Sequence, residues 1–217
     1  RQMCIRDRFW AVRGSRPDVA AAVLRLGRRV SRGWSVVQDE AMHRLYCYLY
    51  HTRDLGLWLV FSPGALSLIG FSDADHANDP ENTARSTSAG VLFIISAGGA
   101  LMPIEWFSRT QTATARSTPE AEIVSLAELV FSAGLPLQEE LFQITEREVE
   151  MHIGTDSQAT EGIVRAGTSR RLAYLRRYQR VSIASIRDVF AEPQNVLFGV
   201  RSKEIPADVL TLSLIHI

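Results

Sequence analysis

Four acidic residues stand where predicted secondary structure elements begin or end. They are Asp73, Glu122, Asp156 and Asp208. Carboxylates at strand ends and helix starts can converge at one edge of a sheet, where ligands of α/β proteins collect. Such a group, without histidine or cysteine partners, suits Mg²⁺ or Mn²⁺ better than zinc. Two such ions about 4 Å apart can activate water and stabilise the leaving oxygen in phosphodiester hydrolysis.

Two of these acids have acidic neighbours that compete for the same role. Asp73 and Asp75 are two residues apart on a predicted strand and share a face, and Asp75 lies further towards the rim. Glu120 and Glu122 are two apart on a predicted helix and point about 200° apart. Glu122 stacks with Leu126 beside the buried stripe of that helix. For Glu120, interaction with the helix dipole is a sufficient explanation.

The elements that must position these acids follow from hydrophobic periodicity. Residues 15–57 read as two helices, with no chemistry apparent in either. From residue 66 the expected order is strand, strand, strand, helix, strand, helix, helix, strand and helix. The second and third strands form a hairpin around Gly98 and Gly99. We also expect one long helix over AYLRRYQRVSIASIRDVF. This order predicts a mixed sheet covered by helices.

Both ends of the chain differ in texture from the sequence beside them. RQMCIRDR at the start and LSLIHI at the end are similar to translated sequencing-adapter read-through. We therefore expect a non-native leader over 1–12 and a non-native tail over 212–217. Between them we expect a helical segment over 13–60 and an α/β domain over 66–211.

Composition excludes several classes of protein. The formal net charge is zero, which argues against a broad cationic surface but allows a local basic patch. Two cysteines provide neither metal-site spacing nor a disulfide framework. No apolar run approaches the roughly 20 residues of a membrane span, so no membrane partner is expected.

Arginine is concentrated in one stretch that contains no acid. Between Gly162 and Arg187 the stretch carries Arg165, Arg170, Arg171, Arg176, Arg177 and Arg180. This favours a phosphate-facing surface, and the alternative is a solvated helix face in an arginine-rich protein. The run SRTQTATARS adds cations and hydroxyls just before Glu122, placed for phosphate or ribose contacts. The expected nucleic-acid contacts are Arg109, Arg116, Ser117, Gln158, Arg170, Arg171, Arg176 and Arg177.

Four blocks of the sequence, in order, resemble a known family. GFSDADHANDPENTARSTSAGVLFI, SRTQTATARSTPEAEIVSLAEL, TDSQATEGI and IPADVLT look like successive parts of the ribonuclease H domain of copia-type retrotransposon polyproteins. The upstream helical segment resembles the connection from that family's reverse transcriptase. Together the similarity covers roughly residues 13–212.

The resemblance implies a ribonuclease H-like, five-stranded mixed sheet flanked by helices and preceded by a helical segment. It implies cleavage of the RNA strand of RNA–DNA hybrids with two Mg²⁺ ions, Mn²⁺ being the alternative. The family's acids fall on Asp73, Glu122, Asp156 and Asp208, which would be both catalytic residues and metal ligands. It also implies the reverse transcriptase polymerase domain of the same polyprotein as a partner, and a cytoplasmic retrotransposon particle or the nucleus as the location.

The sequence departs from the family in ways that keep alternatives open. No paired-aspartate DD turn is present, so we expect no polymerase activity in this chain. The family usually carries a histidine after the third acid, where this chain has Ala173 and Tyr174, and Leu212 replaces the usual lysine. One alternative is a decayed, non-catalytic copy that folds and binds nucleic acid. Another is a related metal nuclease, such as a DNA strand-transfer enzyme, although the fourth acid and the helical lead-in speak against it.

Overall fold

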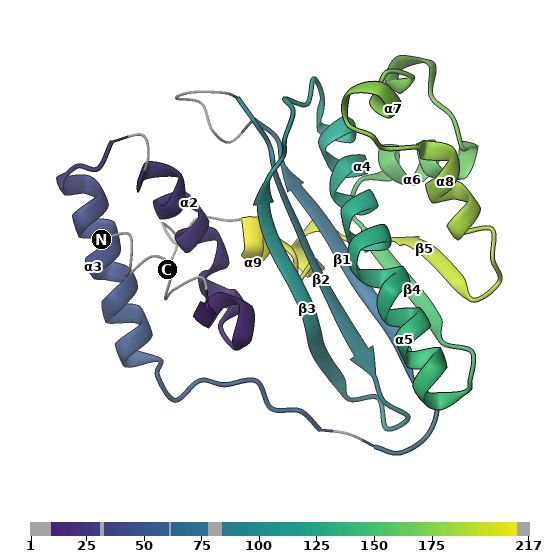
Figure 1. The fold of residues 1–217 in the computed structure, drawn as a ribbon, viewed down its shortest axis with the longest axis horizontal. Helices are drawn as coiled ribbons and strands as arrows, with labels where there is room; N and C mark the ends of the chain where they lie inside the picture. Colours follow the sequence, from purple (N-terminus) through teal and green to yellow (C-terminus); the bar gives the residue numbers. More distant parts are fainter. Residues whose placement is uncertain (1–9, 31–32, 61, 78–83, 212–217) are drawn as a thin grey trace. The chain divides into compact units, whose positions relative to one another are not determined.

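The computed structural model describes residues 10–30, 33–60, 62–77 and 84–211 (Figure 1). The predicted tail over 212–217 and most of the predicted leader therefore lie outside the described residues. The described chain divides into two compact units, with the boundary between Trp58 and Leu59. No helix in the described ranges has the length and apolar character needed to cross a membrane.

The first unit contains the two helices that the sequence predicts. Its elements include η1 (Pro17–Val19), α2 (Ala20–Val30) and α3 (Val36–His51). The buried guanidinium of Arg16 donates to Asp18 at 2.8 Å and to the Thr52 hydroxyl at 2.7 Å. The Tyr48 hydroxyl donates to Asp18 at 2.8 Å. These bonds connect the end of α3 to the residues just before α2. The charges of Arg16 and Asp18 therefore have a structural role.

The second unit is built on five strands in the order β3-β2-β1-β4-β5. Their bounds are β1 (Ser67–Asp75), β2 (Thr87–Ile95), β3 (Leu101–Thr110), β4 (Glu150–Thr155) and β5 (Asn195–Gly199). The β1–β2 and β2–β3 pairs are antiparallel, whereas β4 runs parallel to both β1 and β5. The β2–β3 hairpin turns at Gly99, whose φ of 78° lies in the left-handed region that glycine tolerates. The predicted five-stranded mixed sheet is confirmed.

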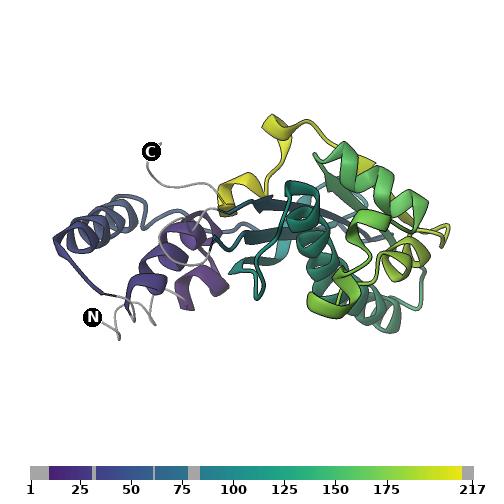
Figure 2. The same ribbon diagram turned by 90° about the horizontal axis from the view of Figure 1, so that it is seen from above.

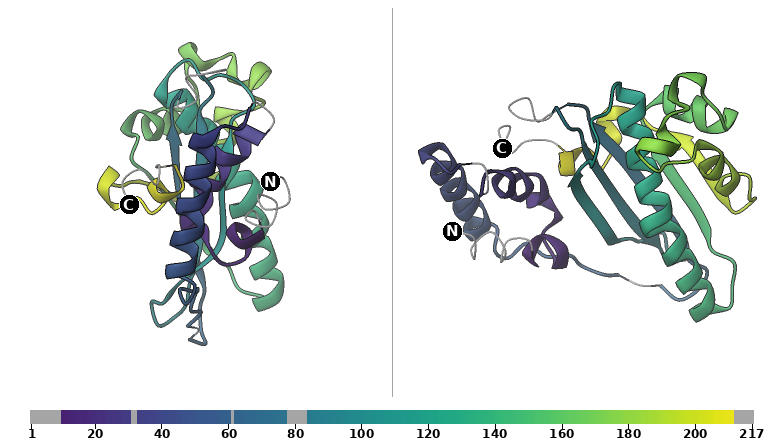
Figure 3. Two further views of the ribbon diagram at one scale, coloured as in Figure 1. Left: turned by 90° about the vertical axis from the view of Figure 1, so that its left-hand side faces the viewer. Right: turned by 45° about the horizontal axis from the view of Figure 1, so that its top comes forward.

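Helices cover this sheet unequally on its two faces (Figures 2 and 3). They are α4 (Thr118–Leu129), η2 (Val130–Gly134), α5 (Leu135–Thr145), α6 (Gln158–Ala166), η3 (Arg170–Leu172), α7 (Leu175–Tyr178), α8 (Ile183–Val189), η4 (Ser202–Glu204) and α9 (Asp208–Thr211). Leu126 and Leu129 of α4 pack with Leu92, Ile153 and other residues into one buried core. The short α9 lies on the opposite face, over β1, β2 and β3.

One expected helix is wrong. The stretch AYLRRYQRVSIASIRDVF forms two separate helices, α7 and α8, instead of one. Arg180 has a φ of 58°, a left-handed conformation that cannot continue a right-handed helix. Ser182 then caps α8 by accepting a hydrogen bond from the backbone N–H of Ser185. The apolar pattern alone did not reveal the break, because the apolar residues Val181 and Ile183 come just after Arg180.

Candidate functional site

The pairing of two parallel strands places Asp73 beside Asp156. The register of β1 and β4 ends where Phe71 lies opposite Gly154. Each aspartate comes two residues after this pair, at the carboxyl end of the parallel strands: Asp73 is still in β1, and Asp156 directly follows β4. Ligands of α/β sheets collect outside such strand ends. Asp73 is buried, with 8% of its surface exposed, and Asp156 is half-buried.

The first turns of α4 deliver Glu122 to the same place. Ser117 caps this helix by accepting a hydrogen bond from the backbone N–H of Glu120. The buried Ser125 hydroxyl is within hydrogen-bonding distance of two carbonyl oxygens, those of Asp73 at 2.7 Å and Ala89 at 3.0 Å, which fixes α4 over β1 and β2. One carboxylate oxygen from each of Asp73, Glu122 and Asp156 lies within 4.8 Å of the other two.

Asp208 comes from the opposite face of the sheet, at the start of α9. The Ser108 hydroxyl donates to the carbonyl oxygen of Leu210 at 2.7 Å, which fastens α9 to β3. Partial burial, and then the charges of Asp73 and Asp156, raise the pKa of Asp208 to about 6. The fourth predicted acid therefore lies in the field of the other carboxylates, although the group within 4.8 Å contains only three.

Glu122 is the most strongly perturbed of the four carboxyl groups. Burial is the main cause, and the charges of Asp73 and Asp156 add to it, so that the pKa of Glu122 rises to about 9. A hydrogen bond with the backbone of Ala74 opposes this rise only in part. Like charges held this close disfavour simultaneous ionisation. At neutral pH the metal-free site therefore keeps a proton on Glu122.

The site fits a divalent cation in its chemistry. All its donors are carboxylate oxygens, the ligands that Mg²⁺ and Mn²⁺ prefer. The Oε2 atom of Glu122 is buried and has no hydrogen-bond partner among the described residues. A buried polar atom of this kind is costly unless something satisfies it, and a cation between the carboxylates would do so. Asp156 has an orienting partner, because the Ser202 hydroxyl donates to its Oδ2.

Glu120 has more partners than its sequence interpretation required. It does lie in the first turn of α4, where the helix dipole favours an acid, but only 1% of its surface is exposed. Its Oε2 atom accepts the backbone N–H of Arg116 at 2.8 Å and the hydroxyl of Tyr174 at 2.6 Å. The two glutamates do point apart, but Glu120 points into a second buried contact. The sequence signal for this was weak, since Tyr174 lies 54 residues away.

The predicted nucleic-acid contacts form two groups. Arg170, Arg171, Arg176 and Arg177 are exposed, as is Gln158 at the start of α6. In the same basic stretch, Arg165 pairs with Glu161 at 2.6 Å and Arg187 pairs with Asp188 at 2.7 Å. Two arginines of the stretch are thus partly neutralised, and its positive charge is smaller than the sequence suggests.

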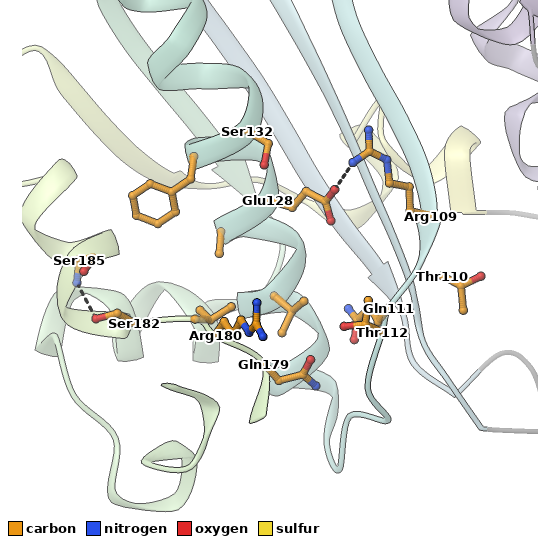
Figure 4. Close-up of a pocket in the computed structure, with 14 residues that line it drawn as sticks. Arg109, Thr110, Gln111, Thr112, Glu128, Ser132, Gln179, Arg180, Ser182 and Ser185 are labelled. Atoms are coloured by element: carbon orange, nitrogen blue, oxygen red, sulfur yellow. Dashed lines mark hydrogen bonds and ion pairs between the residues drawn. The ribbon is translucent and has the colours of Figure 1, made fainter. Parts of the chain in front are cut away.

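The second group is Arg109, Arg116 and Ser117, of which Arg109 alone lines a groove of about 590 Å³ along α4 (Figure 4). Arg116 is exposed and Ser117 half-buried just before α4. Arg109 lies on one wall and pairs with Glu128 at 2.5 Å. Gln179 and Arg180, from the break between α7 and α8, lie on the opposite wall. The lining also includes Gln111, Thr112, Ser182 and Ser185, and it does not include the four acids. Gln179, Ser182 and Ser185 were missed from sequence because the groove exists only where the expected long helix breaks.

Comparison with known proteins identifies several relatives of this chain. It is 35% identical over 114 residues to "Secreted RxLR effector protein 161" of Plasmopara viticola, covering 52% of this chain and 75% of that protein. It is 29% identical over 205 residues to "Retrovirus-related Pol polyprotein from transposon TNT 1-94" of Nicotiana tabacum. That match covers 94% of this chain but only 14% of the polyprotein. The polyprotein from transposon RE2 of Arabidopsis thaliana is 34% identical over 116 residues, which is 52% of this chain and 7% of that one.

Solved structures with similarity to this chain include ribonucleases H. RNase H1 of Halobacterium salinarum has 15% identity and a TM-score of 0.40, covering 63% of this chain and 87% of its own. LC11-RNase H1, isolated from compost, has 15% identity and a TM-score of 0.43, and the match covers 66% of this chain and 91% of that protein. No protein-family model matches the chain.

Proposed function

Because this chain belongs to the family of retrovirus-related Pol polyproteins from transposons, we propose that it is a metal-dependent endoribonuclease that cuts the RNA strand of RNA–DNA hybrids. The chain spans 14% of the tobacco polyprotein, so the proposal concerns this segment. The observation that carries it is the convergence of Asp73, Glu122 and Asp156 from three separate elements within 4.8 Å. A structural explanation for three clustered carboxylates is poor, because their mutual repulsion destabilises the metal-free fold.

The four carboxylates would hold Mg²⁺ or Mn²⁺, with Asp73, Glu122 and Asp156 as the central ligands and Asp208 beside them. When bound, two such ions would supply a water of lowered pKa and charge stabilisation for the phosphodiester. The reaction is hydrolysis: water adds to phosphorus, the bond to the leaving ribose oxygen breaks, and that oxygen takes a proton. Glu122 must lose its proton to act as a ligand, so cation binding would release it.

Substrate binding would fall to the arginines and to the groove. Exposed Arg170, Arg171, Arg176 and Arg177 suit phosphate oxygens, which Arg binds in a bidentate way. Amides and hydroxyls along the groove suit ribose and phosphate contacts, and ribose 2′-OH contacts let a protein distinguish RNA from DNA. Because the net charge is zero, this local surface would guide nucleic acid without broad cationic attraction.

Substrate discrimination tests the proposal. Purified chain is incubated in Mg²⁺ with an end-labelled RNA strand in an RNA–DNA hybrid, and separately with the same RNA alone and with duplex DNA. We expect cleavage of the RNA in the hybrid and little of the other two. Hybrid binding without cleavage would favour the alternative, a copy that folds and binds nucleic acid but does not cut. Cleavage of duplex DNA in preference to hybrid would instead indicate a strand-transfer type of nuclease.

The remaining proposals concern the whole polyprotein. We propose that the polymerase region of the same polyprotein is the partner of this chain and that this chain itself lacks polymerase activity. Its place of action would then be the cytoplasmic retrotransposon particle or the nucleus, where reverse transcription products are made.

A further inference from the structure

Tyr174 stands at the centre of the arginine-rich segment and is not explained by the carboxylate site. On either side of it, Leu172 and Leu175 are buried in the core. Before and after these leucines the arginines are exposed, for example Arg171 and Arg176. The leucines explain why the segment stays attached. The leucines do not explain what fixes the orientation of the segment against α4.

The hydroxyl of Tyr174 supplies one such constraint. It donates a 2.6 Å hydrogen bond to Oε2 of Glu120, and the same oxygen accepts the backbone N–H of Arg116 at 2.8 Å. Glu120 is 1% exposed, so this carboxyl group depends on protein donors in place of water. Hydrogen bonds to a carboxylate are short and stronger than neutral ones. Three chain segments, the loop before α4, its first turn and the arginine-rich stretch, therefore meet at one oxygen atom.

The ring of Tyr174 supplies a second constraint. The guanidinium carbon of Arg116 lies 4.9 Å from the centre of this ring, within the range of a cation–π contact. Arg116 is exposed and is one of the nucleic-acid contacts expected from the sequence. One side chain thus orders both Arg116 and the segment that carries the other phosphate-binding arginines.

We propose that Tyr174, through Glu120 and Arg116, is a positioning residue for nucleic-acid binding. Held in this way, the arginines of the two segments form one preformed surface, and the hybrid need not order them when it binds. Preorganisation of this kind increases affinity by reducing the entropy lost on association. The inference rests on the proposed function, since it takes the polyanionic hybrid as the ligand. It assigns Tyr174 to binding, whereas the chemistry remains with the carboxylates.

The first test replaces the hydroxyl alone. Tyr174→Phe keeps the ring on Arg116 and removes the bond to Glu120. Tyr178→Phe is the matched control, because Tyr178 lies in the same segment but is 68% exposed. Affinity for a fluorescent RNA–DNA hybrid is measured by anisotropy in EDTA, so that cleavage does not interfere. We expect a loss of affinity of about three- to tenfold for Tyr174→Phe, on the scale of one typical intramolecular hydrogen bond, and less than about twofold for Tyr178→Phe.

The second test distinguishes the two glutamate substitutions. Glu120→Gln keeps an oxygen that can accept both bonds, so affinity should stay within about twofold of the wild type. Glu120→Ala removes the acceptor and should lose affinity as Tyr174→Phe does. The double variant Tyr174→Phe/Glu120→Ala should lose little more than either single variant, because both break the same contact. In the cleavage assay, these losses should raise KM and leave kcat nearly unchanged.

A readout without nucleic acid separates this inference from the proposed function. Trypsin cuts after arginine, and the exposed arginines at 170–177 report the local opening of the segment. Tyr174→Phe should speed cleavage there, with little change in the melting temperature. Unchanged proteolysis and unchanged affinity would overturn the inference, and so would faster proteolysis with unchanged affinity. A wild-type chain that bound hybrid without cutting it would contradict the proposed function, while the affinity comparison would still decide the role of Tyr174.

Discussion

Glu120 and Glu122 show how two identical side chains, two residues apart, acquire different surroundings. Both are almost completely buried, with 1% and 4% of their surfaces exposed. Glu120 has donors for its carboxylate, whereas Oε2 of Glu122 has no partner among the described residues and lies among other acids. The first arrangement stabilises a carboxylate within the protein, and the second needs a cation.

This difference predicts opposite results from the same substitution. Glu122→Gln removes a charge that would hold the cations, so hybrid cleavage should fall by at least about 100-fold. Glu120→Gln retains both acceptor contacts and should leave the cleavage rate within about twofold. The measurement is the initial cleavage rate in Mg²⁺ for both variants. Equal losses in the two would show that Glu122 has no special role at the site.

The raised pKa of Glu122 predicts how stability depends on pH. Its pKa is about 9 in the folded metal-free chain, against an ordinary value of 4.5. The folded state therefore holds a proton that the unfolded state releases, so this contribution to stability is fully present below about pH 4.5 and is lost as pH rises towards 9. Asp208, with a pKa of about 6, affects stability in the same direction over a lower pH range.

We therefore expect the melting temperature in EDTA to fall between pH 6 and pH 9. In Glu122→Gln the fall should be much shallower, because the titrating group is gone. In the exposed control Glu105→Gln it should match the wild type. Adding Mg²⁺ at pH 8 should restore stability to the wild type and less so to Glu122→Gln. Parallel pH profiles for wild type and Glu122→Gln would contradict the assignment of the raised pKa.

At the scale of elements, the site depends on close approach between α4 and the sheet. Gly90 of β2 makes this possible, because a Cβ atom there would meet Cε1 of Phe107 at 2.5 Å and Cδ1 of Leu129 at 3.1 Å. Gly162 of α6 is the contrast, since nothing lies within 4 Å of the place its Cβ would occupy. The two glycines thus have different reasons to be present.

Alanine at each position should reveal that contrast. Gly90→Ala overpacks the contact between α4 and the sheet and should destabilise the fold by about 1–3 kcal/mol. Gly162→Ala should stabilise it by up to about 1 kcal/mol, because alanine favours a helix and meets no neighbour here. Denaturant unfolding of both variants measures these changes. A neutral Gly90→Ala would mean that α4 can shift away from the sheet without cost.

Elements with strong local signals were predictable from the sequence. The Ser117 cap with Pro119 marks the start of α4, and Gly98 and Gly99 mark the β2–β3 turn. The break between α7 and α8 was not predictable, because it depends on Arg180 adopting a left-handed conformation that few arginines take. The contact between Glu120 and Tyr174 was missed for a related reason. It depends on tertiary packing, which leaves no periodic trace in the chain.

At the scale of the whole molecule, the two units differ in what they offer to chemistry. In the first unit, the buried Arg16 and the half-buried Asp18 satisfy each other. In the second unit, buried acids repel each other at the carboxyl ends of β1 and β4. Sequence could identify these acids through family resemblance, but only the register of β1 with β4 explains why Asp73 and Asp156 meet. The nuclease activity is therefore proposed for the second unit.

The most direct test of this account is cleavage of an RNA–DNA hybrid by the wild-type chain and by Asp73→Asn, each with Mg²⁺ and with EDTA. Asparagine keeps the size of the side chain but removes the charge that would hold a cation, and melting curves would verify that the variant folds. We predict RNA cleavage only in the reaction of the wild type with Mg²⁺, and none above background in the other three reactions. Cleavage that persisted in EDTA or in folded Asp73→Asn would contradict the central claim that this carboxylate cluster is a metal-dependent nuclease site.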